Sequence, residues 1–441
     1  MALEQTPPPK RSLGLWMSTA LVVGNMIGSG IFLLPASLGA YGGISIIGWL
    51  FTSLGAIVLA LVFSRLSKMM PKTGGPYIYI QQAYGDFAGF LIAWGYWISI
   101  LATNAAISVA FVSYLTVFWP ALATNSLLAA GVALTILWSL TLVNSLGIRN
   151  AGFVQLTTTI LKLVPLVLIA TFGLLYFDVE NLKPFNASGE SPFSAITATA
   201  TLTLWAFVGL ESATIPADDV RNPERTISRA TILGTLICAA VYILSTIAIM
   251  GVIPSAALAT SSAPFADAAS VMWGGWASYA VAAGAVISCF GALNGWILMQ
   301  GQMPLALARD NLFPAIFKRT SKTNTPVAGL LISSALVTIL MGMNYTKGLV
   351  EQFTFIILLA TLTCLLVYVL SAMAELLVLI KNRQQISGRK LLKTLVLSLL
   401  AFSYSAWAIA GSGEATVYWG FLLVMLGVPV YVWLKWQHNR T

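Results

Sequence analysis

The first long hydrophobic stretch of the chain is interrupted near its middle by the segment Gly24-Asn25-Met26-Ile27-Gly28-Ser29-Gly30-Ile31-Phe32. Closely spaced glycines around a serine allow a helix to unwind here. The first amides of the following half-helix would then be free, at the positive end of its dipole. Such a break suits a substrate carboxylate, with the Ser29 hydroxyl as a further donor. A small-residue contact between packed helices is the alternative.

The composition indicates that this break lies inside a membrane. Of 441 residues, 58% are hydrophobic and 8% are charged, whereas a soluble domain averages about 25% charged residues. A run of about 20 apolar residues spans a bilayer core, and the chain holds about twelve such runs. We therefore expect an all-α integral membrane protein with spans at 13–36, 43–66, 84–118, 126–146, 152–176, 193–216, 227–252, 275–308, 326–344, 351–381, 391–411 and 414–434.

The basic residues predict the orientation. The formal charge of +9 is spread along the chain and not gathered in one patch, so nucleic acid is not an expected partner. With the N-terminus inside, 20 of the 23 Lys and Arg residues fall in inner loops and tails, and the outer loops keep only Lys183 and Lys347. Positive charge marks the cytoplasmic side. We expect a multi-pass protein of the cell (inner) membrane with both termini cytoplasmic.

A second interruption occurs in the sixth predicted span. There Gly209 follows Trp205-Ala206-Phe207-Val208 and precedes Glu211-Ser212. Interrupted helices at equivalent positions of two repeats are the best indication of a transporter's binding site in a sequence. An intramembrane carboxylate is costly unless it faces a cavity or a partner, and burial favours its neutral form. Glu211 is thus a candidate for proton binding, and a structural hydrogen bond between helices is the alternative.

Lys162 lies near the middle of the fifth predicted span. An uncompensated ammonium there costs about 3 kcal/mol or more, so it requires a partner or a function. In one interpretation it holds the unwound first span to the eighth, where a sodium-coupled carrier would hold an ion. In the other it exchanges a proton during transport, since buried lysines change protonation readily.

Two further predicted spans carry polar and aromatic faces. Tyr96, Ile100 and Asn104 recur every four residues, as do Trp296 and Gln300, so each set shares one helix face. A tryptophan ring attracts a cationic head group, and an amide can hydrogen-bond it. Interfacial anchoring is the commonest membrane role of tryptophan, but Trp296 falls well inside its span.

Other classes of function lack their motifs. The chain has no GxxxxGK[ST], HExxH or GxSxG run, so neither a nucleotide-driven pump nor a membrane enzyme is indicated. Cys238, Cys289 and Cys364 are isolated within spans, and His438 is the only histidine, so no metal site or cofactor is expected. A channel or sensor on the same fold stays open, because a fold does not determine a function.

Four motifs in order resemble one family along nearly the whole chain: the segment 24–32, Gly74-Gly75-Pro76-Tyr77, 205–212 and Asn222-Pro223-Glu224-Arg225. The chain resembles the amino acid, polyamine and organocation superfamily, most closely the bacterial basic amino acid and polyamine antiporters of the arginine/agmatine type. The resemblance implies twelve transmembrane helices in a LeuT-like five-plus-five inverted repeat with two further C-terminal helices, and alternating access.

The resemblance also implies site residues. It assigns the substrate carboxylate to Ser29 and Gly30, the α-amine to carbonyls of Met26, Trp205 and Val208, and the guanidinium to Trp296 and Asn104. It makes Trp205 a gating residue, and Tyr96, Glu211 and Tyr368 a proximal gate in which Glu211 responds to pH.

Three positions depart from the arginine exchanger. Ala360 replaces a serine that helps to hold the guanidinium, Asn294 replaces a glycine-rich pattern, and Lys162 resembles the fifth-span lysine of other amino acid carriers. The leading hypothesis is therefore exchange of a basic, arginine-like amino acid for its amine or another amino acid. The alternative is proton-coupled or facilitative uptake of neutral amino acids using Lys162. The expected partners are a small amino acid or amine and the lipid bilayer, and a homodimer stays open.

The predicted organisation has no soluble domain. It consists of a cytoplasmic tail, a first repeat of five spans, an external loop, a second repeat of five spans, two trailing spans and a second cytoplasmic tail. These parts occupy 1–12, 13–176, 177–192, 193–381, 391–434 and 435–441.

Overall fold

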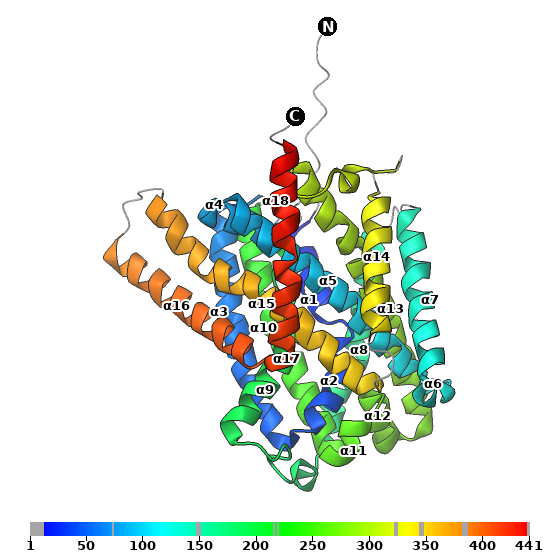
Figure 1. The fold of residues 1–441 in the computed structure, drawn as a ribbon. Helices are drawn as coiled ribbons and strands as arrows, with labels where there is room; N and C mark the ends of the chain where they lie inside the picture. The colour runs from blue at the N-terminus through cyan, green and yellow to red at the C-terminus, as the bar shows by residue number, and fades with distance from the viewer. Residues whose placement is uncertain are drawn as a thin grey trace.

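The computed structural model describes residues 13–72, 75–146, 151–214, 217, 220–321, 325–343, 348–381 and 387–438, with the backbone alone at 151–160 and 438. The tail at 1–12, Gly74 of the second motif and Lys347 lie outside the described residues. The described chain is a bundle of helices (Figure 1).

Long helices alternate with short ones along the chain. In order they are α1 (Leu15–Met26), α2 (Gly30–Gly39), α3 (Ser45–Met69), α4 (Pro76–Tyr84), α5 (Asp86–Leu115), α6 (Ala121–Thr124), α7 (Ser126–Ser145), α8 (Ala151–Phe172), α9 (Pro192–Leu204), α10 (Pro223–Val252), α11 (Ser255–Thr260), α12 (Pro264–Trp273), α13 (Gly275–Arg309), α14 (Val327–Gly342), α15 (Leu349–Lys381), α16 (Gly388–Ala410), α17 (Glu414–Met425) and α18 (Gly427–His438).

The helix bounds agree with the predicted spans to within a few residues. Ten segments in the described chain are long and apolar enough to cross a membrane, and two shorter apolar helices, Leu161–Tyr176 and Val327–Gly342, occupy the predicted fifth and ninth spans. The agreement follows from composition, because a bilayer core requires every backbone polar group to be paired within a helix.

The interrupted spans lie at the centre of the bundle. Burial reaches 89% in the apolar windows of Leu15–Gly39 and of α5, and 72% in that of Pro192–Thr214. It is only 28% in α7, 33% in α16 and 22% in Glu414–Gln437. The outer helices instead expose leucine, valine and aromatic side chains, as a lipid-facing surface requires. The protein interior thus surrounds the two breaks predicted from the glycine pattern.

The two ends of the bundle differ in charge. At one end, the Tyr77 hydroxyl donates to Asp310 Oδ2 at 3.0 Å, Lys381 Nζ donates to Ala83 O at 2.6 Å, and Lys435 pairs with Asp86. These contacts join α4, α5, α13, α15 and α18 at the end where α18 finishes (Figure 1). The described basic residues here are Arg65, Lys68, Lys72, Arg221, Arg225, Arg229, Arg309, Lys318, Arg319, Lys381, Arg389, Lys390, Lys393 and Lys435.

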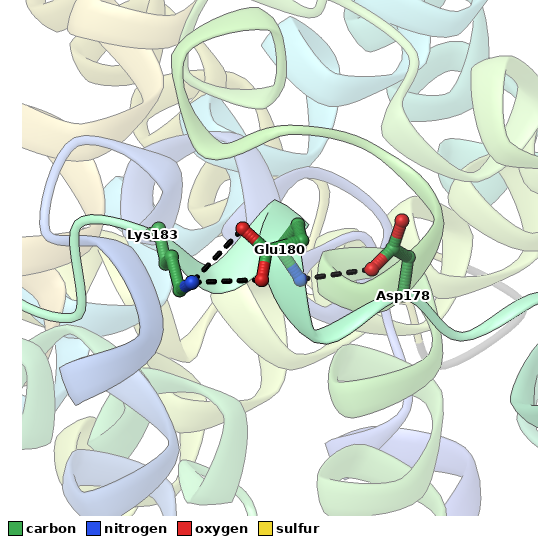
Figure 2. Close-up of polar contacts among 3 residues, drawn as sticks. All are labelled: Asp178, Glu180 and Lys183. Carbon is green, nitrogen blue, oxygen red and sulfur yellow. Dashed lines mark hydrogen bonds and ion pairs between the residues drawn. The ribbon is translucent and has the colours of Figure 1, made fainter.

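The opposite end is acidic and is closed by the segment before α9. Lys183 is the one described basic residue there, and its ammonium donates to both carboxylate oxygens of Glu180 at 2.7 and 2.9 Å. Asp178 accepts from the Glu180 amide and so caps the short 3₁₀ helix η3 (Val179–Leu182) (Figure 2). The pair is exposed, so its energetic contribution is at most about 1 kcal/mol.

Candidate functional site

The first span is broken between α1 and α2. Ile27 ends α1 with ψ at 83°, which is not helical, and the Gly28 amide donates to Met26 O at 2.9 Å in a tight turn. α2 then begins at Gly30 without a side-chain cap. The first amides of a helix have no intrahelical acceptor. The break therefore presents a positive helix end in the protein interior, as the sequence predicted.

The second break follows α9. A 3₁₀ turn, η4 (Trp205–Phe207), leads to Val208 in an extended conformation and to Gly209 with φ at +103°. This φ favours glycine because other residues meet steric strain there. A Cβ at Gly209 would lie 3.5 Å from the Asn25 backbone. The two breaks therefore face each other across the centre of the bundle.

A small cavity lies between the breaks. Its volume is about 20 Å³, which is room for a water molecule but not for an amino acid. The predicted residues Met26, Ser29, Gly30, Trp205, Val208 and Trp296 line it, together with Asn25, Gly28, Thr103 and Ile107. The cavity is thus in a contracted state in this structure.

The Trp205 indole accounts for the contraction. A Cβ built on Gly30 would lie 2.3 Å from Trp205 Cζ3, so the ring rests directly on the start of α2. The Phe353 ring also packs edge-on against the indole, at a centroid distance of 5.3 Å and an interplanar angle of 89°. The indole therefore covers the α2 amides that a carboxylate would reach.

Three polar groups of the cavity-lining residues lack partners. The Ser29 hydroxyl, the Thr103 hydroxyl and the Trp205 Nε1–H are buried, and none of them has a hydrogen-bond partner among the described residues. An unpaired buried polar group costs about 1–3 kcal/mol. Such groups are expected where a ligand completes the hydrogen bonds, so they support a binding site at the break.

Glu211 lies beyond the second break and is fully buried. The Tyr96 hydroxyl donates to Glu211 Oε1 at 2.8 Å, and the Tyr368 hydroxyl donates to Glu211 Oε2 at 2.9 Å. The structure therefore brings together the three residues that the resemblance groups as a gate. The face that Tyr96 shares with Asn104 also made it a candidate substrate-binding residue. In the structure Tyr96 points toward Glu211 and is not among the cavity-lining residues, so that role stays a prediction.

Lys162 connects α8 to the first break. Its ammonium is 1% exposed and donates to the carbonyl oxygen of Gly24, in the last turn of α1. α8 also packs against α10 and α13. The described contact supplies the first-span half of the bridging interpretation. A contact of the ammonium with the eighth span and the proton-exchange interpretation both stay predictions.

Asn104 and Ala360 lie apart from the cavity. The Asn104 amide donates to Gln300 Oε1 at 2.8 Å, and Gln300 Nε2 donates in turn to Ser334 Oγ at 2.7 Å. Ala360 is buried in α15, and its carbonyl accepts from Ser99 Oγ at 2.9 Å. Contact of either residue with substrate would require a larger cavity than the one described, and stays a prediction.

Four neighbours of the site were not predicted from the sequence. Asn25, Thr103 and Ile107 line the cavity, and Phe353 packs on Trp205. Thr103 precedes Asn104, and Ile107 follows Thr103 by one helix turn, so the helical face of α5 could have been extended to both. The contact of Phe353 with Trp205 could not be predicted from local sequence, because it joins α15 to a 3₁₀ turn far away in the chain.

Comparison with known proteins gives three findings. The model of the amino acid permease family matches residues 13–434. The putrescine transporter PotE of Haemophilus influenzae is 33% identical over 97% of this chain and 98% of its own, and the cadaverine/lysine antiporter of Escherichia coli K12 is 39% identical over 75% and 74%. The solved structure of MhsT in complex with L-phenylalanine covers 92% of this chain and all of its own, with a TM-score of 0.65 and 12% identity, which shows a LeuT-like fold.

Proposed function

The chain belongs to the amino acid permease family, and from that premise we propose that it is a secondary antiporter exchanging a basic amino acid for its decarboxylated amine. The observation that carries the proposal is the pair of helix breaks facing one central cavity. Two relatives with substantial identity are described as a putrescine transporter and as a cadaverine/lysine antiporter. Both descriptions concern amines with aliphatic stems and cationic ends.

The carboxylate end of an amino acid would bind at the first break. The start of α2 supplies amides at the positive end of a helix dipole, and the unpaired Ser29 hydroxyl supplies a further donor. The carbonyls of Met26, Trp205 and Val208 are the proposed acceptors of the α-amine. Trp205 would swing away from Gly30 to admit the carboxylate.

The distal cation would bind at the opposite wall. Trp296 is 5% exposed and lines the cavity, and a tryptophan face attracts an ammonium or guanidinium. The described lining contains no carboxylate. A neutral aromatic wall holds both a cationic amine and a zwitterionic amino acid with a cationic side chain, as exchange requires.

The proposed orientation puts the basic end of the bundle in the cytoplasm. The described basic residues concentrate at the end where α18 finishes, and positive charge marks the cytoplasmic side. Both termini would then be cytoplasmic, and the acidic segment 177–192 would form an external loop. We also propose two inverted repeats at 13–176 and 193–381, with trailing spans at 391–434.

Exchange is tested by counterflow in proteoliposomes. We expect radiolabelled lysine or arginine to enter only when the vesicles are preloaded with a basic amino acid or its amine. Vesicles preloaded with a neutral amino acid, and vesicles containing buffer alone, should take up no label. Uptake into empty vesicles driven by a pH gradient would contradict exchange and favour proton-coupled uptake.

Proton-coupled or facilitative uptake of neutral amino acids is the second candidate function. The buried ammonium of Lys162 favours it, because this group lies beside the first break and can lose its proton. Both candidates use the same central cavity. They differ in whether the carrier returns loaded with a second substrate, as in exchange, or without one, as in proton-coupled or facilitative uptake.

Glu211 is expected to make transport depend on pH. In Glu211→Gln the side chain keeps its shape but can no longer ionise, so uptake should vary by less than about twofold across the acidic to neutral range. The measurement is initial exchange rate against pH. Tyr368→Phe is the matched control, because it removes one hydrogen bond and keeps the carboxylate, and should stay pH-dependent. A Glu211→Gln profile identical to that of the unchanged protein would refute this role.

A further inference from the structure

A second cavity opens at the basic end of the bundle, far along α15 from the central site. Its volume is about 790 Å³, and it lies between the last turns of α3, the last turns of α15 and the first turns of α16. Figure 1 shows α16 on the outside of the bundle, beside α15 and α3. The basic residues of its described lining are Arg65, Lys68, Arg389, Lys390 and Lys393.

The polar lining is strongly cationic. It has five basic side chains and one carboxylate, a net formal charge of +4. That carboxylate, Glu375, lies 3.7 Å from Arg65 Nη1, and the same guanidinium nitrogen donates to Thr394 Oγ1 at 3.0 Å. Lys68, Arg389 and Lys393 have no ion-pair partner among the residues that the structure describes. The cavity therefore holds excess positive charge that the described protein does not neutralise.

The start of α16 adds to this charge. Three cations lie within its first six residues, and its first turn has no acidic residue. A helix N-terminus carries a partial positive charge and is stabilised by anions, so cations there are unfavourable unless an anion is bound. The Ser387 side chain already accepts from the Lys390 amide and caps the helix. The three side-chain cations and the positive helix end therefore make the arrangement suited to a phosphate.

The apolar part of the lining distinguishes a phospholipid head group from a free phosphate ion. Met69, Met70, Val378 and Leu379 form an apolar wall. Outside the cavity lining, α16 also presents apolar side chains that are 40–60% exposed, namely Leu391, Leu392, Leu395, Val396, Leu399 and Leu400. A free phosphate ion gains no favourable contact from apolar side chains. A phospholipid has a charged head group joined to acyl chains and matches both parts.

We propose that this cavity binds the head group of an anionic phospholipid, with the acyl chains along the exposed face of α16. Basic pockets between transmembrane helices are a recurring site for anionic lipid head groups. The bound lipid joins α16 to α15, the helix that also carries Tyr368 and Phe353. It is therefore a structural ligand that supports one wall of the gate.

The test is lipid binding to the purified full-length protein, followed by native mass spectrometry and by thermal unfolding. The probes are phosphatidylglycerol, zwitterionic phosphatidylcholine and inorganic phosphate. We expect phosphatidylglycerol alone to bind and to raise the unfolding temperature, since a ligand of the folded state stabilises it by mass action. Combined Arg389→Gln, Lys390→Gln and Lys393→Gln substitutions should weaken that binding by about tenfold or more.

The matched control combines Arg309→Gln, Lys318→Gln and Arg319→Gln. These residues are exposed at the same end of the bundle, outside the cavity lining. The control removes the same charge and should keep the affinity of the unchanged protein. If phosphatidylglycerol binding weakened equally in both variants, the effect would come from net charge alone, and the proposed site would be overturned. Equal stabilisation by inorganic phosphate would overturn the lipid as occupant, and equal binding of phosphatidylcholine would overturn the role of charge.

Discussion

Gly30→Ala is expected to reduce exchange by more than about tenfold, because the new methyl group would occupy the place of the Trp205 ring. A Cβ at this position lies 2.3 Å from Cζ3 and 2.7 Å from Cε3 of Trp205. The Phe353 ring of α15 packs edge-on against the indole, so a methyl group at residue 30 that displaces the indole from its closed position would also disturb that contact. The closed state is then lost, and so is the carrier cycle that passes through it. Counterflow of radiolabelled lysine measures the effect.

Gly28→Ala is the matched control in the same break. A Cβ there meets only the Ala292 Cβ at 3.7 Å, an ordinary contact. Both substitutions restrict the backbone of the first span similarly, but only one reaches the indole. We expect Gly28→Ala to retain most of the exchange activity. Equal activity of the two variants would mean that contact between Trp205 and α2 is not needed for transport.

Lys162→Met should lower exchange by about tenfold or more, even with equal pH on both sides of the membrane. Methionine is an unbranched side chain one atom shorter than lysine and has no donor, so the Gly24 carbonyl would lose this partner in the protein interior, at a cost of about 1–3 kcal/mol. The last turn of α1 would lose its hydrogen bond to α8. The measurement is lysine counterflow without a pH gradient.

The same variant separates the two interpretations of Lys162. If the ammonium serves only to carry a proton, Lys162→Met abolishes uptake driven by a pH gradient and leaves exchange at equal pH intact. If it holds α1, both activities fall together, which is the result we expect. Lys183→Met provides the control, since this lysine is exposed in the segment before α9 and its ammonium pairs with Glu180.

The fold was predictable because a bilayer core requires long apolar helical segments, and these are visible in the sequence as apolar runs. The helix bounds follow the apolar runs, and the break at Gly28-Ser29-Gly30 follows from residues that cannot sustain a helix without packing support. The twelve-helix LeuT-like fold expected from the resemblance is confirmed by the family match and the structural likeness. Here local sequence and global architecture agree.

The candidate site was only partly predictable, because its remaining features depend on side-chain direction. Helix periodicity put Asn104 on a polar face, but the choice between the cavity and Gln300 depends on how α13 packs against α5. The packing of Phe353 on Trp205 joins segments that are about 150 residues apart in the chain. The basic cavity likewise requires the ends of three helices to meet, and no single segment carries that information.

The contact between Trp205 and Gly30 has a thermodynamic consequence. A carrier whose resting site has room for little more than a water molecule must open before it binds, so its apparent dissociation constant equals the intrinsic one divided by the fraction of open molecules. That fraction multiplies the affinity of every substrate equally. Ratios of affinities between two amines will therefore report on contacts with the cavity walls, whereas a substitution that frees the indole will tighten binding of all of them together.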